Sequence, residues 1–187
     1  MLYQDDAASK TAASAETPIP KNREFYTDVT EKWRETATPN SHVVQDLQEY
    51  TANGVTYKVD GHNVVLDYSP HEKEIAELIE KEFGGEMYMV PRVNSPQGVS
   101  TPDYLFRGQR YDLKTLGGKA GTDTIFQRVK KAKRQSHNFI IDISDTELDK
   151  ETVNQQINKI FWQDQTAFVD KLVIVKNGVI EQIVKRT

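Results

Sequence analysis

The chain has 187 residues, of which 37% are hydrophobic and 28% are charged, and its formal net charge is −4. This length fits one domain with a small appendage, and the hydrophobic content is enough for one core. The sequence contains no cysteine, which excludes disulfides and thiolate metal sites. Since it has no run of 18 apolar residues and does not start with a basic-then-apolar signal peptide, we expect no membrane span.

The N-terminal part differs in composition from the rest. Residues 1–21 are rich in Ala, Ser, Thr and Asp, which is typical of a flexible linker. Residues 22–36 are predicted to form a helix because apolar residues recur at i, i+4 and i+8. A second short helix is predicted over residues 43–50. The sequence therefore predicts an N-terminal helical segment over residues 22–54 and a main domain over residues 55–187.

The main domain opens with two β-type runs, residues 54–59 and 64–68, on either side of Asp60-Gly61. An Asp-Gly between two such runs predicts a β-hairpin. A helix follows, with Ser69 as its N-cap and Pro70 in its first turn, and it is expected to end at Gly84-Gly85.

Two glutamates in this helix are candidates for a site. At 100° per residue, Glu72 falls inside the apolar arc of the helix and Glu74 lies at its border. A glutamate near a helix N-terminus can simply be an end charge that the helix dipole favours. Alternatively, one of the two is a metal-binding carboxylate that points at the sheet.

Residues 101–115 read T-P-D-Y-L-F-R-G-Q-R-Y-D-L-K-T, which predicts a second hairpin with a turn near Gly108. If the turn is Gly108-Gln109, Asp103 lies opposite Lys114. If it is Arg107-Gly108, Asp103 lies opposite Asp112. Both registers place Asp103, Asp112 and Lys114 on one face of the sheet. A three-residue loop would instead put Asp103 opposite Leu113.

Two carboxylates and one ammonium group on the same face suit a hard divalent cation beside a phosphate. Carboxylate oxygens hold Mg²⁺ or Mn²⁺, and the bound metal lowers the pKa of a water molecule. The lysine can orient that water or stabilise the charge that develops on phosphorus. The alternative interpretation is an ordinary surface hairpin with charges on its solvated face.

A basic segment follows the hairpin. Residues 105–137 contain nine Lys or Arg and two acids, although the whole chain is acidic. A helix is predicted over residues 123–134, and four of its basic residues are candidates for binding a phosphate backbone: Arg128, Lys130, Lys131 and Arg134. A solvated basic face, balanced by acids elsewhere, is the alternative.

The remaining elements are a buried strand over residues 139–143, a helix from Thr146 or Asp149 to about residue 162, and a C-terminal hairpin around Asn177-Gly178. The order of elements predicts an α/β fold, with a mixed sheet covered by helices on both faces.

Five motifs carry a family resemblance: H-E-K-E-I-A at 71–76, F-G-G-E-M-Y-M-V-P-R at 83–92, T-P-D-Y-L-F at 101–106, Y-D-L-K at 111–114 and Q-S-H-N-F-I-I-D-I at 135–143. Together they resemble the PD-(D/E)xK nuclease superfamily. More closely, the chain is similar to the C-terminal nuclease domains of contact-dependent growth inhibition toxins, and to domains that end some phage head-morphogenesis proteins.

The resemblance implies a restriction-endonuclease-like mixed sheet and a metal-dependent nuclease toxin domain over residues 55–187, often acting on tRNA. It also implies an N-terminal carrier protein that delivers the domain to the cytoplasm of competitor bacteria, and a cognate immunity protein. The expected cofactor is Mg²⁺, with Mn²⁺ or Zn²⁺ as alternatives. The alternative functions are a DNase of the same fold and a non-catalytic nucleic-acid-binding domain.

The resemblance also assigns roles by position. Asp103 and Asp112 would be metal ligands, and Lys114 would be the catalytic lysine. Glu72 or Glu74 would be the helix carboxylate that completes the metal site. Gln135 would orient water or contact phosphate.

Overall fold

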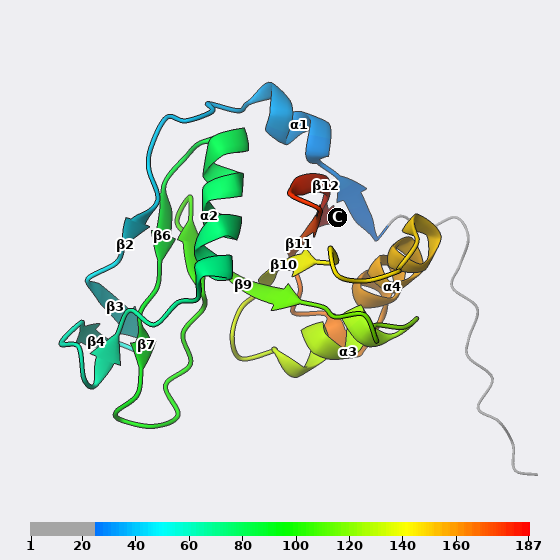
Figure 1. Cartoon of the computed structure of the whole chain (residues 1–187). Helices are drawn as coiled ribbons and strands as arrows, with labels where there is room; N and C mark the ends of the chain where they lie inside the picture. Colours follow the sequence, from blue (N-terminus) through cyan, green and yellow to red (C-terminus); the bar gives the residue numbers. More distant parts are fainter. Residues whose placement is uncertain (1–24) are drawn as a thin grey trace, which may run out of the picture.

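A computed structural model describes residues 25–187 (Figure 1). Its main feature is an eight-stranded sheet in the order β1-β12-β11-β10-β9-β8-β6-β2, in which β9, β10 and β11 are parallel and most other pairs are antiparallel. The strands of this sheet are β1 (Tyr26–Asp28), β2 (Gln45–Asp46), β6 (Met87–Met89), β8 (Tyr104–Phe106), β9 (Gln109–Thr115), β10 (Asn138–Asp142), β11 (Lys171–Lys176) and β12 (Val179–Arg186). The predicted α/β fold with a mixed sheet and flanking helices is confirmed.

Four α-helices and one short 3₁₀ helix flank the sheet in the described part of the chain: α1 (Thr30–Glu35), α2 (Pro70–Phe83), α3 (Thr124–Lys131), α4 (Lys150–Trp162) and η1 (Asp164–Thr166). Two small two-stranded sheets pair β3 (Glu49–Ala52) with β4 (Val55–Lys58), and β5 (Val64–Val65) with β7 (Arg92–Val93). Within residues 25–187, no helix is both long and apolar enough to cross a lipid bilayer.

The central strand β10 is buried on both faces and separates two cores. Phe139 and Ile141 point into the core formed with α3 and α4, whereas Ile140 points into the core formed with α2. This alternation follows from the period of two along a strand. It gives the sheet a helical layer on each face, as Figure 1 shows.

Local sequence signals set both ends of α2, as predicted. The Ser69 side chain accepts a hydrogen bond from the Glu72 backbone N–H, and the Glu72 side chain accepts one from the Ser69 N–H, which forms a capping box. At the other end, Gly84 has φ of 67°. A Cβ there would collide with the carbonyl oxygen of Thr38, so only glycine fits.

The β8–β9 hairpin turns on Arg107-Gly108. These residues have φ angles of 50° and 74°, which is the type I′ turn favoured in two-residue hairpins. Tyr104 pairs with Tyr111, and continuing this register places Asp103 opposite Asp112. One of the three predicted registers is therefore confirmed, and the other two are wrong.

Two predictions near the N-terminus are wrong because distant pairing decides the structure there. Residues 43–50 form no helix; they contribute β2, which pairs with β6, and the start of β3. The hairpin expected at Asp60-Gly61 does not form, because β4 pairs with β3 across Asn53-Gly54. Asp60 instead closes a turn, with its Oδ1 accepting three backbone N–H bonds.

The helix predicted over residues 22–36 is confirmed only for α1. Residues 26–28 form β1, which pairs with the edge of β12. Residues 22–24, and the whole linker predicted over residues 1–21, lie outside the described residues. The change from strand to helix occurs at Asp28, whose Oδ1 accepts hydrogen bonds from the N–H of Thr30 at 2.9 Å and from its hydroxyl at 2.6 Å.

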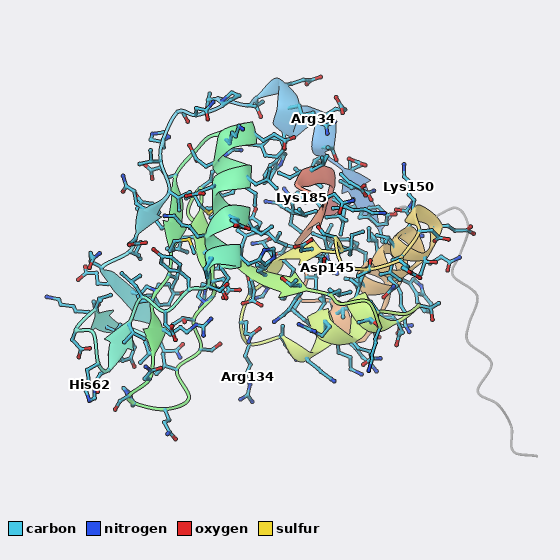
Figure 2. The ribbon with its side chains drawn as sticks, in the orientation of Figure 1. Arg34, His62, Arg134, Asp145, Lys150 and Lys185 are labelled. Carbon is cyan, nitrogen blue, oxygen red and sulfur yellow. The ribbon has the colours of Figure 1, made fainter. Side chains whose placement is uncertain are left out.

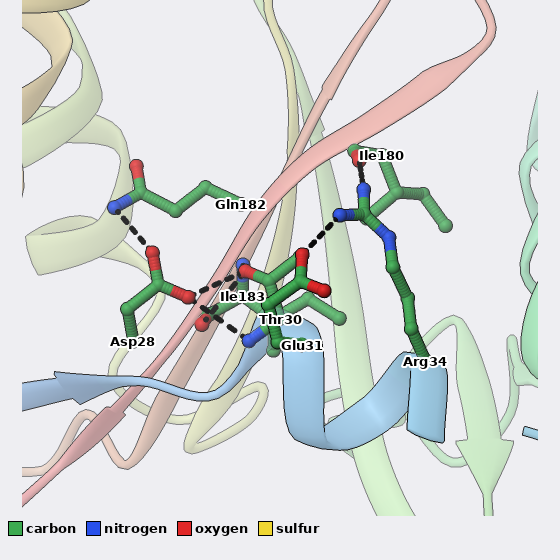
Figure 3. A network of polar contacts seen from close by, with 7 residues as sticks. All are labelled: Asp28, Thr30, Glu31, Arg34, Ile180, Gln182 and Ile183. Carbon is green, nitrogen blue, oxygen red and sulfur yellow. Dashed lines mark hydrogen bonds and ion pairs between the residues drawn. The ribbon is translucent and has the colours of Figure 1, made fainter. Parts of the chain in front are cut away.

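Thr30 joins this N-terminal segment to β12. Its Oγ1 accepts a hydrogen bond of 2.8 Å from the Ile183 N–H, and the neighbouring Val29 N–H donates to the Ile183 carbonyl at 2.8 Å. Figure 3 shows the bonds of Thr30 with Asp28 and Ile183, together with the ion pair between Arg34 and Glu31, whose length is 2.6 Å. The Thr30 side chain is buried, so the bond is shielded from water.

We expect Thr30→Ala to lower the free energy of unfolding by about 1–3 kcal/mol, because it leaves the buried Ile183 N–H without an acceptor. Thr36→Ala is a matched control: the same atoms are removed from an exposed site at the end of the same helix. It should cost less than about 0.5 kcal/mol. Urea denaturation of both variants measures the difference, and equal losses would contradict the role of Thr30.

Candidate active site at the β8–β9 hairpin

Asp103 and Asp112 face each other across the hairpin. Asp112 is buried on β9, and Asp103 lies just before β8, where its Oδ2 accepts a hydrogen bond of 2.7 Å from the Leu113 N–H. Burial and the negative charge of Asp112 raise the pKa of Asp103 to about 7, although the Leu113 N–H opposes the shift. Asp103 therefore keeps its proton up to about neutral pH.

Lys114 and Gln135 complete a polar chain with Asp112. The Lys114 Nζ lies 2.7 Å from Asp112 Oδ2 and donates a hydrogen bond of 2.8 Å to Gln135 Oε1. Gln135 follows α3, so an element distant in sequence fixes the lysine from the other side. Asp112 and Lys114 lie beside Phe139 and Ile141 of β10, which places both on the α3 face of the sheet. The structure thus brings together four predicted residues.

Only one of the two candidate glutamates lies near the cluster formed by Asp103, Asp112, Lys114 and Gln135. Glu72 is close enough to Asp103 that its charge contributes to raising the Asp103 pKa, after the larger effects of burial and Asp112. Its Oε1 accepts a bond of 3.2 Å from Arg92, and its Oε2 belongs to the capping box. Glu74 is 73% exposed, and it lies 3.8 Å from His71. The two interpretations of Glu72 are therefore compatible: it caps the helix and it lies beside Asp103.

The arrangement of Asp103 and Asp112 fits a hard divalent cation. Mg²⁺ is commonly held by one or two carboxylates and completes its shell with water and phosphate oxygens. Asp112 Oδ2 is buried and lies 2.7 Å from the Lys114 ammonium. In the described part of the chain, no three His, Cys, Asp or Glu side chains form a ready metal cluster. The structure therefore places two possible protein ligands together, Asp103 and Asp112, with Glu72 nearby.

The basic candidates lie on and after α3. The inward side of the helix is as predicted, because Ile125, Val129 and Ala132 are buried. The helix is shorter than expected and ends at Lys131, so Arg134 lies in the turn that follows. Arg128, Lys131 and Arg134 are exposed, and Lys130 is half-buried. Figure 2 shows the Arg134 side chain extending away from the fold.

Sequence reasoning missed a carboxylate–imidazole pair beside Glu72. His71 Nε2 lies 2.9 Å from Oδ2 of the buried Asp142, and Asp142 Oδ1 accepts bonds from the backbone N–H and hydroxyl of Ser144. Two sequence features could have indicated this pair: Asp142 is at the end of a strand predicted to be buried, and His71 is in the H-E-K-E motif. This pair joins the start of α2 to the end of β10.

Comparison with known proteins finds a match to one family over less than half of the chain. Residues 100–180 match the contact-dependent growth inhibition CdiA C-terminal domain. The chain is also similar to a solved structure described as the CdiA-CT/CdiI toxin and immunity complex from Burkholderia pseudomallei, with 21% identity and a TM-score of 0.47. That likeness covers 62% of this chain and 82% of the other. No curated protein matches the sequence.

The matched segment runs from the β8–β9 hairpin to the start of β12 and contains Asp103, Asp112, Lys114 and Gln135. The finer resemblance to the PD-(D/E)xK superfamily stays a prediction. Over these residues the chain is similar to the contact-dependent growth inhibition CdiA C-terminal domain.

Proposed function

We propose that this chain is a metal-dependent nuclease toxin domain that hydrolyses phosphodiester bonds in RNA, with tRNA as the expected substrate. The proposal depends on one cluster of side chains, Asp103, Asp112, Lys114 and Gln135. In this cluster two carboxylates face each other, one has a raised pKa, and a positioned ammonium group lies next to them. Perturbed carboxylates of this kind are concentrated at functional sites. The family match supports the toxin role.

Asp103 and Asp112 would hold the divalent cation, expected to be Mg²⁺. A bound cation of this kind supplies an acidified water molecule and positive charge close to the phosphate. Cation binding favours the ionised form of Asp103, so the proton held on this residue at neutral pH would be released on loading. The positive charge of the cation would then offset the repulsion between ionised Asp103 and Asp112.

Lys114 would stabilise the negative charge that develops on the phosphate oxygens. Asp112 and Gln135 hold its ammonium group from two sides, which fixes its position before the substrate arrives. Lysine has three N–H donors, and these two partners leave one available for a phosphate oxygen. Gln135 would therefore act as a positioning residue through Lys114.

The exposed cations Arg128, Lys131 and Arg134 would bind the substrate backbone. Gln135 directly follows Arg134, so this basic surface adjoins the residues that hold Lys114. Contacts to phosphate position a nucleic acid without reading its bases. The domain would reach the target-cell cytoplasm as the C-terminal part of a larger carrier, and a cognate immunity protein would protect the producing cell.

The activity is tested by incubating the protein with total tRNA and with plasmid DNA, in Mg²⁺, Mn²⁺, Zn²⁺ or EDTA, followed by gel analysis. We expect cleavage of tRNA with Mg²⁺ and none with EDTA. Cleavage of plasmid DNA alone would mean that the same site acts as a DNase and not as an RNase. No cleavage of either substrate with any of the metals would contradict the proposal.

We expect Glu72→Ala to reduce cleavage at least about tenfold and Glu74→Ala to stay within a few-fold of wild type. The reason is that Glu72 lies beside Asp103, whereas Glu74 is exposed. Because Glu72 also caps α2, Ser69→Ala is the control: it breaks the capping box and keeps the Glu72 carboxylate. Initial rates at saturating Mg²⁺ decide the question. Equal activity of Glu72→Ala and Ser69→Ala would leave Glu72 with a structural role only.

We expect the double change Arg128→Ala with Lys131→Ala to raise KM and to flatten the salt dependence of RNA binding by up to about two units of slope, with kcat close to wild type. Both side chains are exposed on α3. Lys58→Ala with Lys81→Ala removes the same charge from exposed positions on β4 and α2 and serves as the control. Identical salt slopes for the two double variants would mean that α3 only presents a solvated basic face.

A further inference from the structure

We propose that the hollow at the amino-terminal ends of β9, β10 and β11 is a binding site for a phosphate group. The hollow encloses about 140 Å³ and is lined by Gln109, Asn138, Asp170, Lys171, Lys185 and Arg186. Three of these six side chains are cationic and one is acidic, so the lining carries a net charge of about +2. A small pocket with several donors and excess positive charge suits an anion.

Lys171 is at the centre of this site. Its Nζ donates hydrogen bonds to Gln109 Oε1 at 2.9 Å and to the Tyr111 hydroxyl at 3.1 Å, and it lies 5.3 Å from the centre of the Trp33 ring. An ammonium group has three donors, so one remains for a ligand. The two hydrogen bonds and the ring fix the ammonium in place, which lowers the entropy lost when an anion binds.

Lys171 also lies among like charges without a compensating ion pair. It is directly opposite Lys185 in the β11–β12 ladder, an arrangement that is destabilising for two cations. Burial, followed by the charges of Lys185 and Arg107, lowers the pKa of Lys171 to about 8, and Asp170 opposes this only weakly. Among residues 25–187, no Asp or Glu side chain forms an ion pair with Lys171 or Lys185. A bound anion would relieve this repulsion.

Neighbouring donors suit a ligand with several oxygens. The Gln109 Oε1 accepts a hydrogen bond from Lys171. The N–H groups of the same side-chain amide are not used in this bond. Arg186 donates to the carbonyls of Phe161, Thr166 and Val169 and adds positive charge to the lining. Several donors that converge from different strands match the oxygens of a phosphate better than the two of a carboxylate.

This hollow is separate from the candidate active site. Tyr111 points into the α2 core, whereas Asp112 and Lys114 point to the α3 face, so Lys171 and the two facing carboxylates lie on opposite sides of β9. The proposed phosphate site therefore does not depend on a metal at Asp103 and Asp112. It also does not depend on cleavage.

The test is isothermal titration calorimetry with inorganic phosphate at pH 7. We expect wild type to bind, and Lys171→Met or Lys185→Met to weaken binding about tenfold or more, because each removes a charged donor. Lys176→Met is the matched control, because it removes the same charge from the other end of β11. We also expect the affinity of wild type to fall as the pH rises through about 8, where Lys171 loses its proton.

A second arm identifies the source of the phosphate. A short RNA is titrated into Asp112→Asn protein, with and without Lys171→Met, so that cleavage does not interfere. If Lys171→Met weakens RNA binding and phosphate binding together, the site takes a backbone phosphate. If it weakens phosphate binding alone, the site takes a small phosphorylated molecule. No phosphate binding by wild type, or an equal loss in Lys176→Met, would overturn the proposal whether or not the protein is a nuclease.

Discussion

Replacing Asp112 by asparagine is expected to reduce RNA cleavage by at least about 10³-fold while the domain stays folded. The substitution keeps the shape of the side chain and removes one of two carboxylates that would hold the cation. It also removes the ion pair of 2.7 Å that holds one side of Lys114. The loss should therefore appear in kcat and should not be recovered by raising the Mg²⁺ concentration.

The fold should tolerate Asp112→Asn because the change ends the repulsion between two facing carboxylates, and because Lys114 keeps its bond to Gln135. Asp123→Asn is the matched control. Asp123 also forms an ion pair of 2.7 Å with a lysine, Lys159, away from the site. Circular dichroism and initial rates of both variants separate a catalytic loss from unfolding. A fully active Asp112→Asn protein would remove the hairpin from the mechanism.

Replacing Asp103 by asparagine is expected to stabilise the metal-free protein above neutral pH. The pKa of Asp103 is raised to about 7, so the folded state holds a proton that the unfolded state has released. The wild-type contribution is fully present below about pH 4 and is lost as the pH rises through about 7. An asparagine side chain cannot ionise, so this loss should vanish in the Asp103→Asn variant.

The expected gain is about 1–3 kcal/mol at pH 8 in EDTA, a range that allows for partial exposure of the group. Urea denaturation at pH 5 and pH 8 measures it. Adding Mg²⁺ at pH 8 should stabilise wild type and leave Asp103→Asn unchanged, because ligand binding to the folded state adds stability. Asp123→Asn again serves as a control, since the pKa of Asp123 is lowered and its titration lies below this pH range. A wild-type protein whose stability rises from pH 5 to pH 8 would contradict the assignment.

Helices and hairpins whose ends are marked by capping or turn residues were predicted from sequence with nearly their observed bounds. Ser69, Pro70 and Gly84 define α2, and Asn177-Gly178 defines the C-terminal hairpin. Elsewhere the outcome depended on partners far along the chain. Residues 43–50 have an ambiguous local pattern, and pairing of β2 with β6 decides that they are not helical. Local periodicity does not contain that information.

In the candidate site, too, local patterns were enough for some features, whereas others depended on residues far along the chain. Alternation along β9 was enough to predict that Asp112 and Lys114 share a face, and either two-residue turn brings Asp103 to it. The register itself was not predictable, because it requires a positive φ at Arg107, a residue that rarely adopts one. The choice between Glu72 and Glu74 depends on the tertiary neighbours Arg92 and Asp103.

The pairing of β1 with β12 limits where the fold can be separated from any chain that precedes it. The Thr187 N–H donates to the Phe25 carbonyl at 3.0 Å, so the two ends of the described chain lie side by side. A cut after Asp28 would uncover the backbone donors and acceptors of β12, and an open strand edge promotes association with other chains. A fragment that begins at residue 29 should therefore aggregate more readily than one that begins before Phe25.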